Sequence, residues 1–470
     1  MRAWDADAGI RRRVDPGVLE PPSQRAWTGH LPHLGDDEGV AFVAVVDTIR
    51  AREILDCRGE TTLEVDVELS GGQRGRAAVP SGGSKGRHEA AQMRNDRPWS
   101  RGVGSAAAVS VVNETIAPAL RGTDFEDQVA LDTKLLEMDG TPDKSRLGAN
   151  CMLGVSVAFA RSAARAAGLP LYAHLVRPGD PLLPLPLFDV LNGGAHADNG
   201  LEIEEFMVVP IGARSLSEAV RWGGECFTAL RAVLEGDGFR TAFGDHGGFA
   251  PDPGDNVEAI ELLLEAMRSA GFRAGKDVVL ALDAAASGYY DGEAYRSPGA
   301  KGTRISSAEL VDFWVRLCRD YPIWSIEDGI AEDDLEGWLL LTRALGSEVV
   351  LVGDDVFATD PDVISGAIVD EIGNAIVVKP DQIGTITEAL EAIEEARAGH
   401  WVTVVASRAG DTTDDFLADF AVATAAGAIK AGAPCRGERV AKYNQLLRIE
   451  EELGPAARFA GATGLRRPSR

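Results

Sequence analysis

The chain of 470 residues carries 47 Lys+Arg against 73 Asp+Glu, which gives a formal net charge of −26. This excess of acid argues against general nucleic-acid binding and against attachment to an anionic membrane, because both need a basic surface. Hydrophobic residues make up 45% of the chain, enough for a sizeable core, so wholesale disorder is excluded. The length suggests two or three domains, or a small domain beside a large barrel.

Neither a membrane span nor a secretion signal is visible in the sequence. No apolar run approaches the roughly 18 residues that a membrane helix needs. The first residues, MRAWDADAGIRRRVDPG, lack the apolar centre of a signal peptide. The five cysteines are scattered without CxxC spacing, which is typical of reduced thiols. We therefore expect a cytoplasmic protein with no membrane span and no nucleic-acid partner.

The first half of the chain predicts an extension followed by a small domain. Residues 1–45 show no sustained period and indicate an N-terminal extension without chemistry of its own. Alternation over 61–69 predicts a strand, and apolar spacing over 106–120 and 150–167 predicts helices, so 46–180 should form an α+β domain. The proline-rich stretch 181–186 is expected to link it to a second domain over 181–458, followed by a tail over 459–470.

In the second domain, short β-branched runs keep ending in a charged residue. They are VVLALD at Asp283, IWSIED at Glu327, VVLVGD at Asp354, AIVVK at Lys379 and VTVVASR at Arg408. The last four ends lie about 25–30 residues apart, the length of a strand, a helix and two loops. Such repeated units predict a parallel sheet, which we expect to close as a (β/α)8 barrel. The alternative, an open doubly wound sheet, is disfavoured because no glycine-rich phosphate fingerprint is found.

These strand ends carry a pattern of residue types suited to metal-assisted chemistry. Functional residues of a barrel gather at the C-terminal ends of its strands. There, Asp283, Glu327 and Asp354 would offer hard oxygen ligands for Mg²⁺; the alternative is that each is a helix cap or half of a surface ion pair. Lys379 is a candidate general base, since a nearby dication and the exclusion of water depress the pKa of a lysine.

Longer motifs strongly resemble those of enolase, the Mg²⁺-dependent 2-phosphoglycerate dehydratase. They include SGGSKGRHEA (81–90), NGGAHADN (192–199), SIED (325–328), VGDD (352–355), AIVVK (375–379) and AGAIKAGAP (426–434). The resemblance runs from about Val45 to Arg458. It implies an α/β fold with an enolase-type (β/α)8 barrel behind a smaller N-terminal α+β domain. It also implies a homodimer, a small anionic substrate and Mg²⁺ at one tight site and a second site filled with substrate.

The resemblance assigns the metal ligands by position. Asp283, Glu327 and Asp354 match the ligands of the tight Mg²⁺ site, and Ser84 matches a loop serine that helps to bind the second ion.

The resemblance likewise assigns the residues that act on the substrate. Lys379 matches the base that removes the proton next to the carboxylate, and Lys430 matches the lysine that holds that carboxylate. Arg408 matches the phosphate-binding arginine. Glu205 matches one acid of the leaving-group pair, and His196 matches a histidine that lines the site.

The sequence departs from the family pattern at several of these positions. GDHGG in place of GDEGG puts His246 where the family has a second acid, and an imidazole can donate a proton near neutral pH, so we predict a catalytic role. The alternative for a lone histidine is packing or capping. Ser407 replaces a histidine, Ala409 replaces the phosphate-binding serine, Lys85 is new on the loop, and Glu204 replaces a glutamine.

These departures predict an altered substrate. Smaller side chains near the phosphate, together with Lys85, would suit a 2-phosphoglycerate-like molecule with a larger phosphoryl end. The carboxyphosphonoenolpyruvate synthases of phosphinate antibiotic biosynthesis are enolase relatives of that kind, and we expect a hydro-lyase of that type. Two alternatives stay open: an ordinary enolase that converts 2-phosphoglycerate to phosphoenolpyruvate, and a non-catalytic protein with the enolase fold. The retained carboxylates and lysines argue against the last.

Overall fold

A computed structural model describes residues 44–83, 85–95, 104–176, 181–298 and 303–466. The predicted extension falls almost wholly outside these ranges, and so does Ser84. The domain boundaries expected from the sequence remain predictions.

The first domain is a four-stranded antiparallel meander covered by helices. Its strands are β1 (Ala44–Leu55), β2 (Thr61–Leu69), β3 (Arg74–Ala78) and β4 (Asp124–Phe125), in the order β3-β2-β1-β4. Its helices are α1 (Ala106–Ser110), the π-helical turn η1 (Val111–Ile116), α2 (Ala117–Leu120), α3 (Gln128–Asp139), α4 (Ala149–Ala166) and α5 (Leu171–His174). The strand predicted at 61–69 and the helices predicted at 106–120 and 150–167 are therefore confirmed, the first helix with a π-helical middle.

Helix α4 packs against one face of this sheet, over β2 and β3. Leu63, Val65 and Val67 alternate along β2 with their side chains fully buried, as the period of a half-buried strand requires. Strand β3 approaches α4 so closely that a Cβ on Gly75 would lie 1.8 Å from the Ala158 carbonyl oxygen. A side chain at Gly75 would therefore push the sheet off the helix.

The second domain is a closed eight-stranded barrel. Its strands are β5 (Leu185–Asn192), β6 (Glu205–Val209), β7 (Val279–Asp283), β10 (Ile323–Glu327), β11 (Val350–Gly353), β12 (Ala375–Val378), β13 (Val402–Ala406) and β14 (Ala428–Lys430). The predicted barrel is confirmed, but the expected all-parallel sheet is wrong, because β6 runs antiparallel to both β5 and β7. The connection between β5 and β6 contains only the short 3₁₀ turn η2 (Gly194–His196), with no crossover helix to return the chain to the other end of the barrel.

The proline-rich stretch before the barrel is only partly a linker. Leu185 and Pro186 already belong to β5, where they pair with β14. The linker expected over 181–186 is therefore too long.

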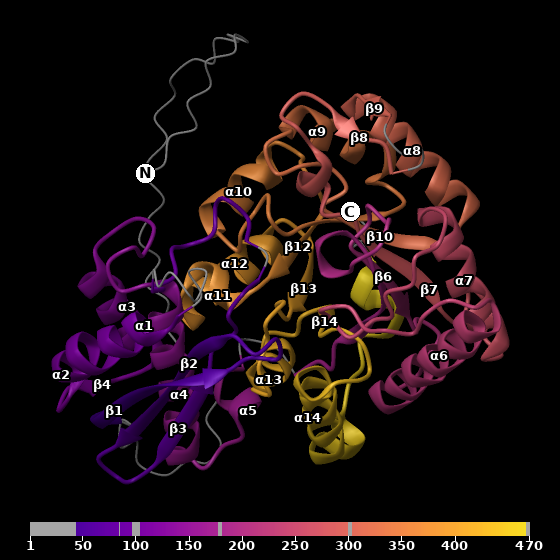
Figure 1. The fold of residues 1–470 in the computed structure, drawn as a ribbon. Helices are drawn as coiled ribbons and strands as arrows, with labels where there is room; N and C mark the ends of the chain where they lie inside the picture. Colours follow the sequence, from indigo (N-terminus) through magenta and orange to yellow (C-terminus); the bar gives the residue numbers. More distant parts are fainter. Residues whose placement is uncertain (1–43, 84, 96–103, 177–180, 299–302, 467–470) are drawn as a thin grey trace. The chain divides into compact units, whose positions relative to one another are not determined.

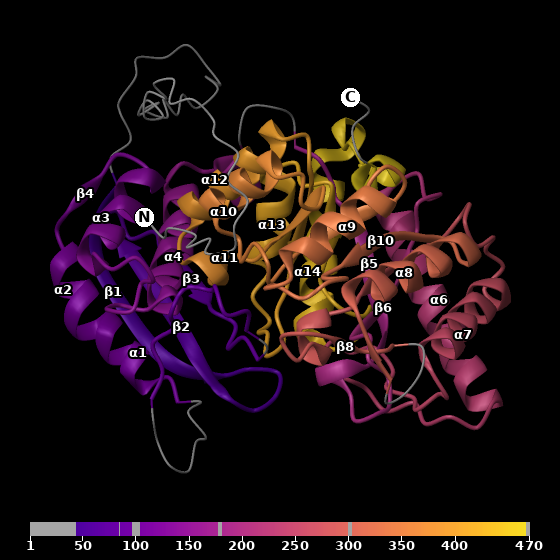
Figure 2. The same ribbon diagram turned by 90° about the horizontal axis from the view of Figure 1, so that it is seen from above.

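Helices surround the barrel, with polar faces outward and apolar faces against the strands. They are α6 (Leu216–Gly236), α7 (Asn256–Ser269), α8 (Ser307–Asp320), α9 (Leu335–Leu345), α10 (Pro361–Val369), α11 (Pro380–Ile383), α12 (Ile386–Ala398), α13 (Phe416–Ala423) and α14 (Gly437–Leu453). The remaining described elements are short. They are a pair of two-residue antiparallel strands, β8 (Tyr295–Arg296) and β9 (Arg304–Ile305), and the 3₁₀ turns η3 (Ala286–Tyr289), η4 (Gly454–Ala456) and η5 (Gly461–Leu465). Figures 1 and 2 show the strands inside and helices such as α6, α7 and α8 outside.

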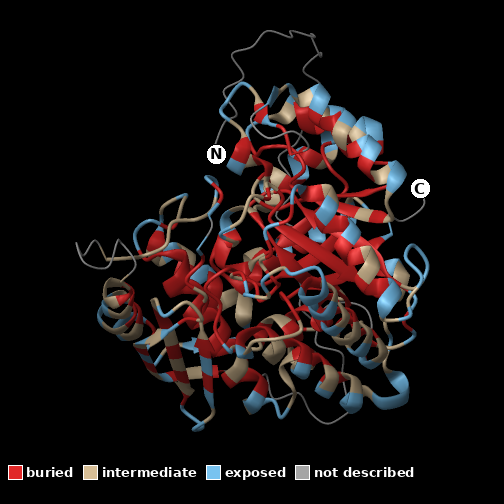
Figure 3. Cartoon of the chain, turned by 45° about the vertical axis from the view of Figure 1, so that its right-hand side comes forward, coloured by how far each residue is buried: buried red, intermediate tan, exposed pale blue. Residues whose placement is uncertain are grey.

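Burial follows this arrangement. In Figure 3 the barrel strands are buried and the outer faces of the surrounding helices are exposed. None of the described helices combines the length and apolar character needed to cross a membrane.

The two domains meet across charged contacts and one long loop. Arg161 of α4 donates to the carboxylates of Asp414 and Asp415, which lie just before α13. The loop after β3 then crosses to the barrel, where the Ser81 amide donates to the Gly410 carbonyl and the Ala90 amide to the Gln382 carbonyl. This loop lies at the rim of the barrel that carries the predicted site residues.

Candidate active site

The alternating pattern of the strands aims the predicted residues into the mouth of the barrel. In β7, Val279 and Ala281 pack inside the barrel while Leu280 and Leu282 pack outside, so Asp283 falls on the inner face. In the later strands, every second residue likewise faces the inside of the barrel, and the series ends in a charged residue. The series are Val350, Val352 and Asp354; Ala375, Val377 and Lys379; Val402, Val404, Ala406 and Arg408; and Ala428 and Lys430. Local sequence therefore determines which strand ends face the site.

The reversed strand β6 brings in a residue that the strand-end argument does not reach. Glu205 is the first residue of β6, and because β6 is antiparallel it pairs with Asn192 and Asp283 at the ends of its neighbours. Its side chain is buried within 3.2 Å of the Lys430 Nζ atom. Only the resemblance to enolase predicted Glu205 from the sequence.

Three strand-end carboxylates face two lysines. The Lys430 Nζ atom lies 2.6 Å from Glu327 Oε1 and 3.0 Å from Asp283 Oδ2. The Lys379 Nζ atom donates to Asp354 Oδ2, and Asp354 Oδ1 accepts from Gln382 Nε2 at 2.9 Å. All five charged side chains are buried or nearly so.

The electrostatics of this cluster follow from that pairing. Burial lowers the pKa of Lys430, but Asp283, Glu205 and Glu327 outweigh it and hold the pKa well above its usual range. Burial and the Asp283 charge raise the pKa of Glu327 well above normal.

Lys379 has a raised pKa, contrary to the depressed pKa that a base needs. Burial lowers its pKa, but the adjacent Asp354 carboxylate outweighs burial. A cation held by Asp354 would offset that carboxylate and lower the pKa of Lys379 again. The donor set fits such a cation: Asp283, Glu327 and Asp354 present only carboxylate oxygens, the ligands that Mg²⁺ prefers.

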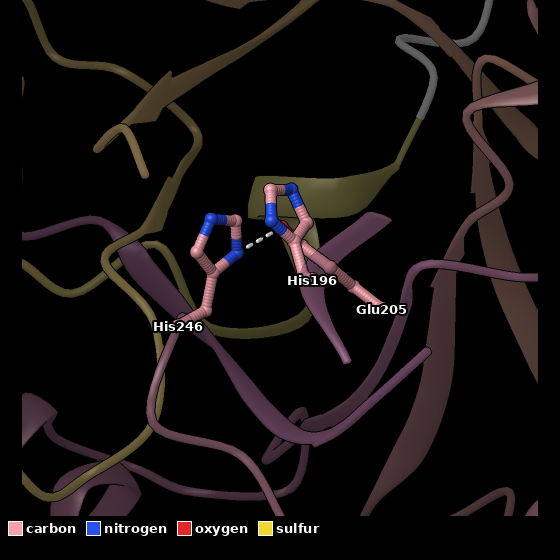
Figure 4. A group of neighbouring side chains, drawn as sticks. All are labelled: His196, Glu205 and His246. Carbon is pink, nitrogen blue, oxygen red and sulfur yellow. Dashed lines mark ion pairs between the residues drawn. The ribbon is translucent and has the colours of Figure 1, made fainter. Parts of the chain in front are cut away.

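Two histidines also line the pocket. Figure 4 shows His196, from η2, beside His246, from the loop between α6 and α7, with Glu205 next to them. The ring centroids lie 4.2 Å apart. His246 Nδ1 lies 2.5 Å from Glu205 Oε1 and 3.4 Å from Asp189 Oδ2, while His196 Nε2 lies 3.2 Å from Glu204 Oε2.

The two histidine rings differ in charge, one neutral and the other positive. Burial, reinforced by the positive charge of His196, lowers the pKa of His246 to about 3. Burial also lowers the pKa of His196, but Asp245 and Glu204 outweigh it and raise the pKa to about 10. The neutral His246 ring donates from Nδ1 to Glu205, which leaves Nε2 as an acceptor. The proton near neutral pH thus resides on His196, whereas the sequence argument put a proton donor at His246.

Arg408 is held by carboxylates. Its Nη1 atom donates to Asp381 Oδ2 at 2.9 Å and to Glu89 Oε2 at 3.1 Å, and its Nη2 atom donates to Glu89 Oε1 at 3.0 Å. Glu89 belongs to the loop that crosses the barrel mouth, so a side chain of the first domain engages an arginine of the second. Burial lowers the pKa of Arg408, but these carboxylates outweigh it and raise the pKa.

Of the remaining predicted residues, some line the pocket and others lie outside it. Ser407 is buried and its Oγ atom accepts from Arg439 Nη1 at 2.8 Å; Ala409 is buried beside it. Lys85 is exposed on the loop and does not line the pocket. Of the predicted residues, the pocket is lined by His196, Glu205, His246, Asp283, Asp354, Lys379, Ser407, Arg408 and Lys430. Glu327 lies beneath them against Lys430.

Sequence reasoning did not single out several residues that shape this pocket. Asp328 accepts from the backbone amides of Asp354 and Asp355 and so fixes the turn after β11. Glu89 and Arg439 reach the site from distant parts of the chain. Asp328 and Glu89 stand inside motifs that carry the resemblance, and Arg439 opens a further one, RVAKYNQLLRIEEELG (439–454), but no role was predicted for any of the three.

Comparisons with known proteins agree with this architecture. The family model described as Enolase, N-terminal domain matches residues 46–175, and that described as Enolase, C-terminal TIM barrel domain matches residues 180–467. A curated protein named Enolase from Acidothermus cellulolyticus is 51% identical over 425 residues, which cover 90% of this chain and 98% of that protein.

Proposed function

The chain belongs to the enolase family of hydro-lyases, and on that premise we propose that it removes water from 2-phosphoglycerate to give phosphoenolpyruvate. The observation that carries this proposal is the cluster of three strand-end carboxylates, Asp283, Glu327 and Asp354, beside Lys379 and Lys430 at one barrel mouth. The 51% identity to a curated enolase supports 2-phosphoglycerate as the substrate.

Mg²⁺ is the metal that the enolase family uses. In our proposal, Asp283, Glu327 and Asp354 hold the tightly bound ion, and Ser84, outside the described residues, takes part in a second site. When bound, the metal supplies positive charge that stabilises the negative charge gathering on the substrate carboxylate.

The protein's own groups supply the remaining chemistry. A proton next to a carboxylate is very weakly acidic, so Lys379 needs a neutral amine and a nearby positive charge to remove it. Lys430, held protonated by its carboxylate neighbours, offers that charge and a hydrogen bond to the substrate carboxylate. Arg408, freed from Glu89, binds the phosphoryl group.

Loss of the hydroxyl group falls to Glu205 and the two histidines beside it. Glu205 lies between Lys430 and His246, and His196 carries a proton at neutral pH. We assign the leaving-group proton to the Glu205–His196–His246 group, with His246 as a hydrogen-bond acceptor.

One specific observation favours a second substrate. Ser407 and Ala409 are small where the family has a histidine and a serine, so the phosphoryl end of the pocket would admit a larger group. A carboxyphosphono analogue would fit this description. The comparisons favour ordinary enolase chemistry, so this substrate is the second candidate, and we do not propose a role in antibiotic biosynthesis.

The test is a direct assay of the purified full-length chain with Mg²⁺ and 2-phosphoglycerate. We expect the ultraviolet absorbance of the enol product to rise with kcat above about 1 s⁻¹. No turnover on 2-phosphoglycerate but turnover on the carboxyphosphono analogue would replace the first candidate with the second. No turnover on either, and no stabilisation by Mg²⁺, would favour the non-catalytic reading.

A homodimer forms the last part of the proposal. Sedimentation or light scattering of the purified chain would check it, and a monomer at micromolar concentration would contradict it.

A further inference from the structure

The histidine pair creates a cluster of nitrogen and oxygen donors separate from the three strand-end carboxylates. One donor atom each from His196, Glu205 and His246 lies within 4.8 Å of the other two. All three side chains are buried. The cluster depends on His246, because the family motif places a glutamate there.

The donor atoms of the cluster are partly arranged for an ion. Histidines that bind metals usually donate their second ring nitrogen to a carboxylate, which fixes the ring. His196 has this contact, because its Nε2 atom faces Glu204, while its Nδ1 atom is buried and has no hydrogen-bond partner within the described part of the chain. His246 Nδ1 already lies 2.5 Å from Glu205 Oε1, so these two atoms can serve the same ion once the ring's proton moves to Nε2, which is buried and has no partner among the described residues.

The charge around the cluster suits a dication. Asp189 Oδ2 lies 3.4 Å from His246 Nδ1, and Asp245 Oδ2 lies 3.6 Å from His196 Nδ1, beyond hydrogen-bonding distance. With Glu204 and Glu205 these make four carboxylates, against the Lys430 ammonium at 3.2 Å from Glu205. A metal has to displace the proton on His196, so its binding releases that proton.

We propose that His196, Glu205 and His246 form a binding site for a transition-metal dication such as Zn²⁺, distinct from the Mg²⁺ site. Two imidazoles and one carboxylate with an open fourth position are a common set for Zn²⁺, whereas Mg²⁺ prefers oxygen alone. Ligand atoms in a tetrahedral zinc site lie about 3.3 Å apart, so the widest pair here has to close by at most about 1.5 Å. Glu205 then serves the metal and is withdrawn from the leaving group.

Calorimetric titration of ZnCl₂ into the full-length chain tests the site, with Mg²⁺ in excess to fill the oxygen-ligand sites. We expect one zinc ion per chain at this site and a loss of at least tenfold in affinity in His246→Gln and in His196→Gln. His88→Gln is the matched control, because His88 also has a carboxylate nearby, Asp333 at 3.7 Å. A second control, His30→Gln with His33→Gln, removes the histidines near the N-terminus. Unchanged affinity in His246→Gln, or loss in either control, would overturn the proposal.

A spectroscopic measurement tests the site on the wild-type chain, so its result does not depend on whether a variant folds. Cu²⁺ bound to the wild-type chain in excess Mg²⁺ should show electron paramagnetic resonance coupling to two imidazole nitrogens. A spectrum with oxygen ligands alone would refute the site. Neither experiment requires turnover, so the zinc site can fail while the proposed lyase activity stands, and the reverse.

Discussion

Lys379 and Lys430 lie in the same pocket but pair with different carboxylates. Lys430 contacts three carboxylates, Glu205, Asp283 and Glu327, whereas Lys379 pairs with Asp354. A cation bound to Asp283, Glu327 and Asp354 therefore takes the carboxylate that Lys379 pairs with, whereas Lys430 keeps its contact with Glu205. This difference matches the proposed roles, in which Lys379 must lose a proton and Lys430 must keep its own.

The first prediction concerns the base. Lys379→Ala should lower kcat on 2-phosphoglycerate by on the order of 10²–10⁴. The other lysine of the pocket, Lys430, cannot replace it as a base, because three carboxylates keep Lys430 protonated. Steady-state kinetics measures the loss, and Lys134→Ala, on the exposed surface of α3, should keep the wild-type rate. A kcat in Lys379→Ala close to that of the wild type would contradict the assignment.

The second prediction separates the two histidines. His246→Gln keeps a hydrogen-bonding side chain but changes the donor and acceptor pattern beside Glu205, so kcat should fall on the order of 10²–10⁴. Since the His246 pKa is about 3 and the His196 pKa is about 10, only His196→Gln should also remove the basic limb of the pH–rate profile. A basic limb that vanishes in His246→Gln instead would return the acid role to His246.

At the scale of elements, the loop over 81–90 couples the two domains through one side chain. Its Glu89 carboxylate occupies both Nη atoms of Arg408, the contacts that a phosphoryl group would use. The loop is also tied to the barrel through Arg87, whose amide donates to Glu332 Oε2. Substrate binding therefore has to exchange Glu89 for phosphate on Arg408.

The third prediction follows from that exchange. Glu89→Gln keeps the shape of the side chain but removes its charge, so Arg408 becomes easier to reach and KM should fall on the order of tenfold, about 1.4 kcal/mol. Asp381 still holds Nη1 and keeps the arginine in place. Initial-rate kinetics gives KM and kcat separately, and a KM that rises would show that Glu89 assists binding instead.

The fourth prediction concerns a buried carboxylate between α3 and α12. Asp132 accepts from the Thr387 amide at 3.0 Å and from its hydroxyl at 2.6 Å, and burial raises the pKa of Asp132 to about 6. Because the folded pKa exceeds the unfolded value of about 3.8, protonation of Asp132 stabilises the fold below that value, and this contribution disappears as pH rises through 6.

Comparison with Asp132→Asn measures this contribution. The free energy of unfolding of the wild type relative to the variant should fall by about 1.4 kcal/mol between pH 5 and pH 7. Urea unfolding at the two pH values measures it. A constant difference would mean that Asp132 keeps an ordinary pKa.

At the scale of the whole molecule, an acidic protein has to attract an anionic substrate. The net charge of −26 describes the exterior and acts against binding, while Lys379, Lys430 and Arg408 concentrate positive charge in one pocket. In this structure carboxylates neutralise all three cations, so the pocket gains positive character only when a metal takes over those carboxylates.

The fifth prediction follows for stability. A metal that binds the native state stabilises it by mass action, so Mg²⁺ at 100 times its Kd should add about 2.7 kcal/mol to the free energy of unfolding. Unfolding with Mg²⁺ and with a chelator gives the difference, and the same pair of measurements on Asp354→Asn should give none. A full Mg²⁺ response in Asp354→Asn would place the ion elsewhere.

Local patterns in the sequence predicted much of this protein. The alternation that ends in Asp283, Asp354 and Lys379 fixes their faces, because the side chains of a strand alternate whatever lies around it. The predicted helices rest on the same local logic. The motifs that resemble enolase added Glu205, which periodicity alone would not have marked, and Lys430, which ends a strand of only three residues.

Only the tertiary structure decided how distant segments meet. The antiparallel course of β6 places Glu205 at the rim, and Glu89 reaches Arg408 across 319 residues of sequence. The charge states of His196 and His246 likewise depend on carboxylates from separate segments. These features were beyond the sequence because a pKa or an ion pair depends on which groups lie within a few ångströms, and such distances are set by the packing of the whole chain.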